Sequence, residues 1–189
     1  HDPAGVVRVL VVPVAGGESR RVHEGEASSM LEWTSPSTLV MTDQDGYRLG
    51  WLDPDVRETR GRVSARCLFG RWIPELRQLV CRVNGVATLL DPETGRDVQV
   101  RLTASDGTDG SPLAGSGFRV LGGDLMVYVS VDGELLAAPY DHARHRIGRP
   151  ARLGHQVRAE ALGDAQYDVT PDGTLLFAPG VNAEIGQLV

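Results

Sequence analysis

The sequence predicts an all-β protein, a β-propeller built from four-stranded antiparallel blades, with about four blades' worth of strands. Three observations predict it. Short β-favouring runs recur along the whole chain at similar intervals, as in repeat proteins. Turn residues (Gly, Pro, Ser and Asp) precede these runs, which is typical of hairpins. The long 3.6-period apolar stripes of helical repeats are absent, because only residues 157–165 have much helical composition, and Gly163 interrupts them.

The repeat is clearest in four hairpins whose anchoring leucines, Leu39, Leu79, Leu125 and Leu175, lie 40, 46 and 50 residues apart. Each hairpin has a large apolar residue, then a turn, then a short strand. The four segments are 33–41, 72–81, 118–128 and 169–177. Four short strands per ~40 to 50 residues is the spacing of propeller blades.

A third strand follows each of the first three hairpins and ends on an aspartate that opens a turn, as at Asp53, Asp91 and Asp141. The N-terminal run Val6–Val14 matches such a third strand. The predicted division is a half-blade at 1–24, blades at 27–63, 66–102 and 116–154, and a half-blade at 165–189. The two halves add up to one blade, so we expect the ring to close within one chain, or else between two copies joined edge to edge.

Composition excludes several classes of protein. With 189 residues and 41% hydrophobic residues, the chain can bury one sizeable core. The net charge is −6 and the arginines are scattered, so we expect no nucleic-acid partner. The longest apolar run, Val6–Ala15, is interrupted by Arg8 and contains Pro13, so no membrane span is encoded. We expect both ends to be cuts in a longer polypeptide.

The blade motifs resemble the TolB-like, WD-repeat-like β-propellers of bacteria. Val169–Phe177 (Val-Thr-Pro-Asp-Gly-Thr-Leu-Leu-Phe) and the Leu89–Gly95 turn carry the resemblance. Asp132–Asp141 is similar to propellers attached to bacterial serine/threonine kinases or regulators. The chain departs from the pattern at Pro74-Glu-Leu-Arg, and it lacks the Trp-Asp dipeptide of true WD repeats. The resemblance implies a propeller fold and favours a periplasmic or extracytoplasmic location.

The two cysteines, Cys67 and Cys81, fall on the two arms of the second hairpin. A hairpin centred near Pro74 places them opposite each other, with Cα atoms within ~7 Å. Either a disulfide or two buried thiols fits this placement.

No segment of the sequence forms a motif for catalysis or metal binding. His142 and His145 lie in a turn beside arginines, and metal sites usually need three or four converging ligands, so we interpret both as loop histidines. Residues 43–46 and 106–110 are interpreted as Asp-Gly turns rather than calcium loops, and 115–117 as a loop. Since the chain has no Lys, it has neither a P-loop lysine nor a Schiff-base lysine. We therefore expect no catalytic residue, metal or cofactor.

The function predicted is a noncatalytic interaction or scaffold module that binds a protein, peptide or small ligand on a propeller face. The alternative is the propeller part of an enzyme: a hydrolase, a lyase or the gating domain of a peptidase. The recurring Trp33, Trp51 and Trp72 are interpreted as core rather than as a stacking platform. The predicted core between blades is Trp33, Leu39, Trp72, Leu79, Leu125, Leu175 and Phe177.

Overall fold

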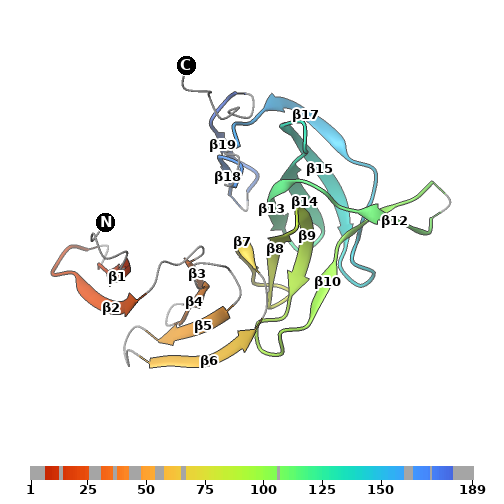
Figure 1. Ribbon diagram of the computed structural model, residues 1–189. Helices are drawn as coiled ribbons and strands as arrows, with labels where there is room; N and C mark the ends of the chain where they lie inside the picture. Colours follow the sequence, from red (N-terminus) through yellow and green to blue (C-terminus); the bar gives the residue numbers. More distant parts are fainter. Residues whose placement is uncertain are drawn as a thin grey trace, which may run out of the picture.

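The computed structural model describes residues 7–12, 15–25, 31–35, 38–42, 48–53, 58–64, 67–105, 107–159, 164–170 and 172–180. Every regular element in these residues is a β-strand. The strands form successive antiparallel sheets that follow one another along an arc (Figure 1). The predicted all-β class and propeller architecture are confirmed, and the arc is a partial propeller.

Two sheets have four strands that pair in chain order. The first contains β3 (Leu31–Ser35), β4 (Thr38–Thr42), β5 (Arg48–Asp53) and β6 (Glu58–Ser64). The second contains β7 (Leu68–Ile73), β8 (Gln78–Val83), β9 (Val86–Leu90) and β10 (Asp97–Gln99). Figure 1 shows β3 and β7 on the inner side of the arc and β6 and β10 on its outer side.

The turn after β9 shows why an aspartate ends these strands. One carboxylate oxygen of Asp91 accepts a hydrogen bond from the backbone N–H of Glu93 at 2.8 Å, and the other accepts from the hydroxyl of Thr94 at 2.8 Å. Gly95 then adopts a φ of 73°, which favours glycine. The side chain thus supplies the local bonds that reverse the chain.

The third sheet is larger because a long strand has two partners on the same edge. β13 (Ser116–Leu121), β14 (Leu125–Val129) and β15 (Glu134–Asp141) pair in order, and the first part of β15 pairs with β17 (Ala151–Gln156). The last residues of β15 pair instead with β16 (Arg146–Ile147).

An arm joins the second sheet to the third. β11 (Arg101–Thr103) pairs antiparallel with β12 (Asp109–Pro112) and parallel with β16.

The loop expected at 115–117 is wrong in part, because Ser116 and Gly117 begin β13. Of the expected turn 106–110, Asp106 lies outside the described residues and Asp109 begins β12. The expected turn at 43–46 also lies outside them.

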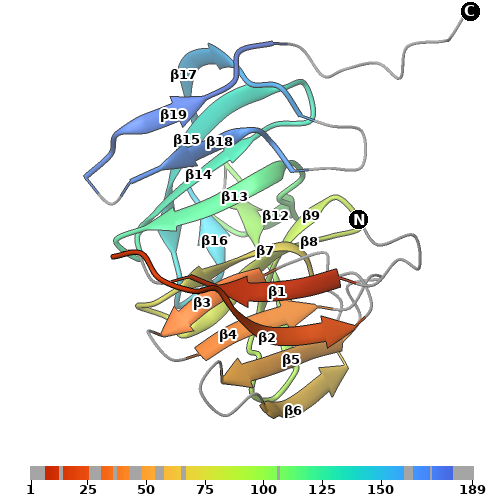
Figure 2. The same cartoon turned by 90° about the vertical axis from the view of Figure 1, so that its left-hand side faces the viewer.

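The two ends of the chain each contribute a two-stranded sheet. β1 (Val7–Val11) pairs with β2 (Arg20–Gly25), and β18 (Tyr167–Val169) pairs with β19 (Leu175–Phe177). Among the described residues neither β1 nor β19 has a second partner strand. The two sheets lie apart in both views (Figures 1 and 2). The expected closure within one chain is wrong, and residues 181–189 of the predicted last half-blade lie outside the described residues.

The core is continuous from the second sheet into the third. A single cluster of buried side chains includes Ile73 and Leu89 from the second sheet and Phe118, Met126 and Ile147 from the third. The predicted core residues Leu39 and Leu79 are buried, and Trp72, Leu175 and Phe177 are partly buried against other clusters.

Two of the predicted core residues are wrong. Trp33 is 47% exposed and Leu125 is 37% exposed. Trp33 lies on β3 at the inner side of the arc, where it lines a cavity together with Trp72 and Pro74. Leu125 begins β14 directly after a turn, and its strand reaches the core only from Met126 onward. Hydrophobic character alone did not distinguish these positions from buried ones.

Cys67 and Cys81 form a disulfide in the structure, with Cα atoms 5.0 Å apart. Both are fully buried in a cluster that also holds Val40, Leu79 and Leu90. The expected register is wrong: Ile73 pairs with Gln78, so the hairpin is centred between Glu75 and Leu76 and not on Pro74, and the cysteines are not directly opposite.

Candidate functional site

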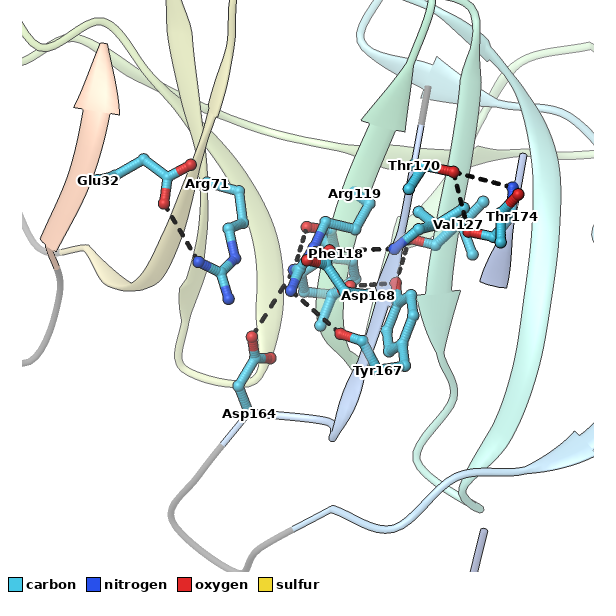
Figure 3. A network of polar contacts seen from close by, with 12 residues as sticks. Glu32, Arg71, Phe118, Arg119, Val127, Asp164, Tyr167, Asp168, Thr170 and Thr174 are labelled. Carbon is cyan, nitrogen blue, oxygen red and sulfur yellow. Dashed lines mark hydrogen bonds and ion pairs between the residues drawn. The ribbon is translucent and has the colours of Figure 1, made fainter. Parts of the chain in front are cut away.

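The innermost strands of four successive sheets each carry one charged side chain next to an aromatic residue. The four charged residues are Glu32 on β3, Arg71 on β7, Arg119 on β13 and Asp168 on β18. Figure 3 shows that they converge along the inner side of the arc. Acidic residues lie at the two ends of this series and the arginines lie between them.

Glu32 and Arg71 join the first sheet to the second. An Nη of Arg71 donates to the Glu32 carboxylate at 3.1 Å, and both side chains are partly buried. The Nε of Arg71 is buried and has no hydrogen-bond partner among the described residues. Arg71 is therefore held by a single ion pair with Glu32, while its buried Nε is left without an acceptor.

Arg119 joins the third sheet to the last one. Its side chain is only 8% exposed. The guanidinium donates to the backbone oxygens of Phe118 at 3.1 Å and Tyr167 at 3.4 Å, and its Nε lies 3.3 Å from Asp168. Asp164 adds a second carboxylate at 3.7 Å. Because a buried charge must be paired and hydrogen-bonded, this set of acceptors accounts for an arginine in the interior.

Tyr167 completes the contact between these two sheets. The Arg119 guanidinium lies 5.3 Å from the centre of the Tyr167 ring, which is a cation–π geometry. The Tyr167 hydroxyl contacts the backbone oxygens of Gly117 and Val127. Burial of the ring raises the pKa of Tyr167, so the phenol stays protonated well into alkaline solution.

Gly117 is required at this contact for two reasons. Its φ is 63°, in the left-handed region, and a Cβ there would lie 2.6 Å from the Tyr167 ring. Any side chain at this position would displace the tyrosine.

Two cavities open beside these side chains. The first, of about 260 Å³, is lined by Glu32, Arg71, Trp72, Pro74, Glu75, Arg119, Val120, Leu121, Gly122, Asp168 and Val169. The second, of about 380 Å³, is lined by Trp33, Thr34, Ser35, Trp72 and Pro74. Because Trp72 and Pro74 line both cavities, the two form one surface across β3, β7, β13 and β18, called here the tryptophan groove.

The free charge in the tryptophan groove is acidic. The carboxylate of Glu75 has no hydrogen-bond or ion-pair partner among the described residues, and the same holds for Oδ2 of Asp168, whose side chain is 76% exposed. The arginine charges, by contrast, are already held by Glu32, Asp164 and Asp168. A ligand in the groove therefore meets two tryptophans and unpaired carboxylates.

The histidines singled out from the sequence lie elsewhere. His142 and His145 occupy the turn between β15 and β16, where desolvation lowers the pKa of His145. Among the described residues no group of three or more His, Cys, Asp and Glu side chains is placed to hold a metal ion. The same part of the chain contains no helix that could cross a membrane.

Sequence reasoning missed the four charged residues of the groove. The available signal was local: the pairs Glu32-Trp33, Arg71-Trp72, Phe118-Arg119 and Tyr167-Asp168 all come just before a hairpin turn. A charge that recurs beside an aromatic residue on an otherwise apolar inner strand indicates a polar contact between neighbouring sheets.

The chain resembles several solved structures at low identity. An auxiliary nutrient-binding protein from Bacteroides thetaiotaomicron aligns at 13% identity and a TM-score of 0.51, over 90% of this chain and 47% of that one. Hydrazine synthase from Kuenenia stuttgartiensis aligns at 12% identity and a TM-score of 0.42, over 77% and 53%. BamB from Moraxella catarrhalis aligns at 11% identity and a TM-score of 0.40, over 82% and 69%.

The chain spans about half the length of the first two of these structures. No protein-family model matches the chain, and no curated protein matches it. The similarity to the nutrient-binding protein supports the fold.

Proposed function

We propose that this chain is a noncatalytic propeller module that binds a partner in the tryptophan groove. One observation carries the proposal: Trp33, a large aromatic residue, is 47% exposed at the wall of a cavity that shares Trp72 and Pro74 with a second, charged cavity. Exposed aromatic residues in concave sites are typical anchors for ligands, because they bury a large area at small entropic cost.

Part of the wall of the groove is anchored to the core, which suits recognition. Trp72 packs against the core cluster that holds the Cys67–Cys81 disulfide. Arg119, which lines the charged cavity, holds the third and last sheets together through its contacts with Asp168 and Tyr167. A preformed site loses little conformational entropy when a ligand binds.

Selection from a random peptide library tests this function. Clones enriched on the wild-type chain should lose binding to Trp33→Ser, since Trp33 is exposed and its loss leaves the core intact. The matched control is Val131→Ser, an exposed residue in the turn between β14 and β15 that lines neither cavity. Clones that bind Trp33→Ser as tightly as they bind Val131→Ser and the wild type would contradict the proposed function. A selection that enriches no clone would also contradict it.

The finer classification is also a proposal. The motifs of Val169–Phe177 and Leu89–Gly95 support a TolB-like propeller, and the order of the sheets supports a division into three blades and two half-blades. The strands differ from the predicted bounds in the third blade, where β17 ends at Gln156 and β11 joins the sheet. The buried disulfide supports an extracytoplasmic location, because disulfides persist in oxidising compartments.

A further inference from the structure

We propose that the tryptophan groove receives a basic side chain, Arg or Lys, of a peptide segment in a partner protein. This inference rests on the proposed function and names the chemistry of its ligand. It follows from three features of the groove: its aromatic wall, its unpaired carboxylates, and its two arginines, whose charges are already paired with carboxylates.

The aromatic wall suits the stem and the charge of a basic side chain. Trp33 and Trp72 line the same cavity with Pro74, so two indole rings border one space. Indole faces attract cations, and the aliphatic stems of Arg and Lys cover apolar surface while the charged ends stay polar.

Two carboxylates line the cavity that borders the aromatic one. Glu75 and Asp168 line the charged cavity together with Trp72 and Pro74, which border the aromatic cavity as well. Glu75 and Oδ2 of Asp168 have no partner among the described residues. A guanidinium or ammonium bound here would gain charge-assisted hydrogen bonds without breaking any contact already present.

An anionic ligand fits less well. Arg119 already donates to Asp168 and to two backbone oxygens, and it lies close to Asp164. The Arg71 charge is matched by Glu32, and its buried Nε has no hydrogen-bond partner among the described residues. An incoming carboxylate would face Glu75 and Asp168 across the same cavity.

The test uses three short dye-labelled peptides built from repeats of Gly-Arg-Gly-Ser, Gly-Gln-Gly-Ser or Gly-Glu-Gly-Ser, titrated with the chain and followed by fluorescence anisotropy. The arginine peptide should bind most tightly and the glutamate peptide least. The double variant Glu75→Gln/Asp168→Asn should weaken binding of the arginine peptide by about tenfold, the effect of two exposed ion pairs. Asparagine retains Oδ1 at position 168, so the hydrogen bond from Arg119 is kept.

The matched control is Glu18→Gln/Asp97→Asn, which changes the net charge by the same amount at exposed positions outside the groove. This control should leave binding of the arginine peptide unchanged. Equal weakening by both double variants would overturn the proposal, because attraction by net charge alone would then explain binding. Equal or tighter binding of the glutamine or glutamate peptide would also overturn it.

The library selection separates failure of this inference from failure of the proposed function. Clones that depend on Trp33 but carry no Arg or Lys would overturn the basic side chain as ligand and leave the groove as the binding site. Absence of any Trp33-dependent clone, with no binding of the three peptides, would overturn both.

Discussion

Replacement of Arg119 by Met should destabilise the chain strongly, because it removes the charge that holds the third sheet to the last one. Methionine fills much of the same volume, so the loss comes from the polar contacts. The backbone oxygens of Phe118 and Tyr167 lose a donor, and Asp164 loses its paired charge in a partly buried position.

The magnitude follows from the burial of each partner. Breaking a buried pair costs about 3 to 5 kcal/mol. Asp168 is 76% exposed and regains water when the arginine is lost, so we expect the lower end, about 3 kcal/mol. The control Arg77→Met removes an ion pair with Glu93 at the surface, where Arg77 is 79% exposed, and should cost less than about 1 kcal/mol.

Urea denaturation followed by circular dichroism measures both variants. Double-mutant cycles then divide the Arg119 contribution: coupling to Asp164→Asn should be about 1 to 2 kcal/mol. Coupling to Asp168→Asn should be below about 1 kcal/mol. If Arg119→Met is as stable as the wild type, the guanidinium does not join the two sheets and the reasoning is wrong.

Tyr167→Phe should cost about 1 kcal/mol at neutral pH, for the hydroxyl contact, by urea denaturation. Because burial raises the folded-state pKa of Tyr167, the wild type should lose about 1.4 kcal/mol of stability per pH unit above about pH 10, relative to this variant; parallel pH profiles would refute this. Leu79→Ala, at a fully buried position, should cost about 2 to 5 kcal/mol and Leu176→Ala, at an exposed one, almost nothing, as the two melting curves would show. Reduction of Cys67–Cys81 should cost about 3 kcal/mol, and mass spectrometry should detect no alkylation of either cysteine before reduction.

The sequence was sufficient for most strands of the blades because their determinants are local. Asp91 ends a strand through bonds to residues within three positions of itself, and the recurring Leu39 and Leu79 mark buried steps of a repeat. Such patterns depend on a few neighbouring residues, so the fold class and the order of the sheets followed from them.

The groove could not be predicted in the same way. Glu32 and Arg71 are 39 positions apart and Arg119 and Asp168 are 49 apart, so their pairing depends on how the sheets pack. Trp33 and Trp72 occupy the same step of the repeat, yet Trp33 is exposed while Trp72 is partly buried. Closure between β1 and β19 was likewise expected from strand counting, which takes no account of where the arc places its ends.

The arm formed by β11 and β12 limits how far this protein can be treated as a string of modules. β11 pairs with β16 of the third sheet. At the two ends of the arm, the N–H of Val100 donates to the oxygen of Ala87 in the second sheet, the N–H of Leu113 donates to the oxygen of Val100, and the N–H of Ala87 donates to the oxygen of Leu113. In a simple repeat array, neighbouring units meet only through their faces and can be deleted or duplicated one at a time. Here the main chain of one unit is bonded into the next. A deletion or recombination point placed between residues 100 and 115 would cut shared backbone bonds, so evolution and protein engineering must exchange the second and third sheets as a single piece.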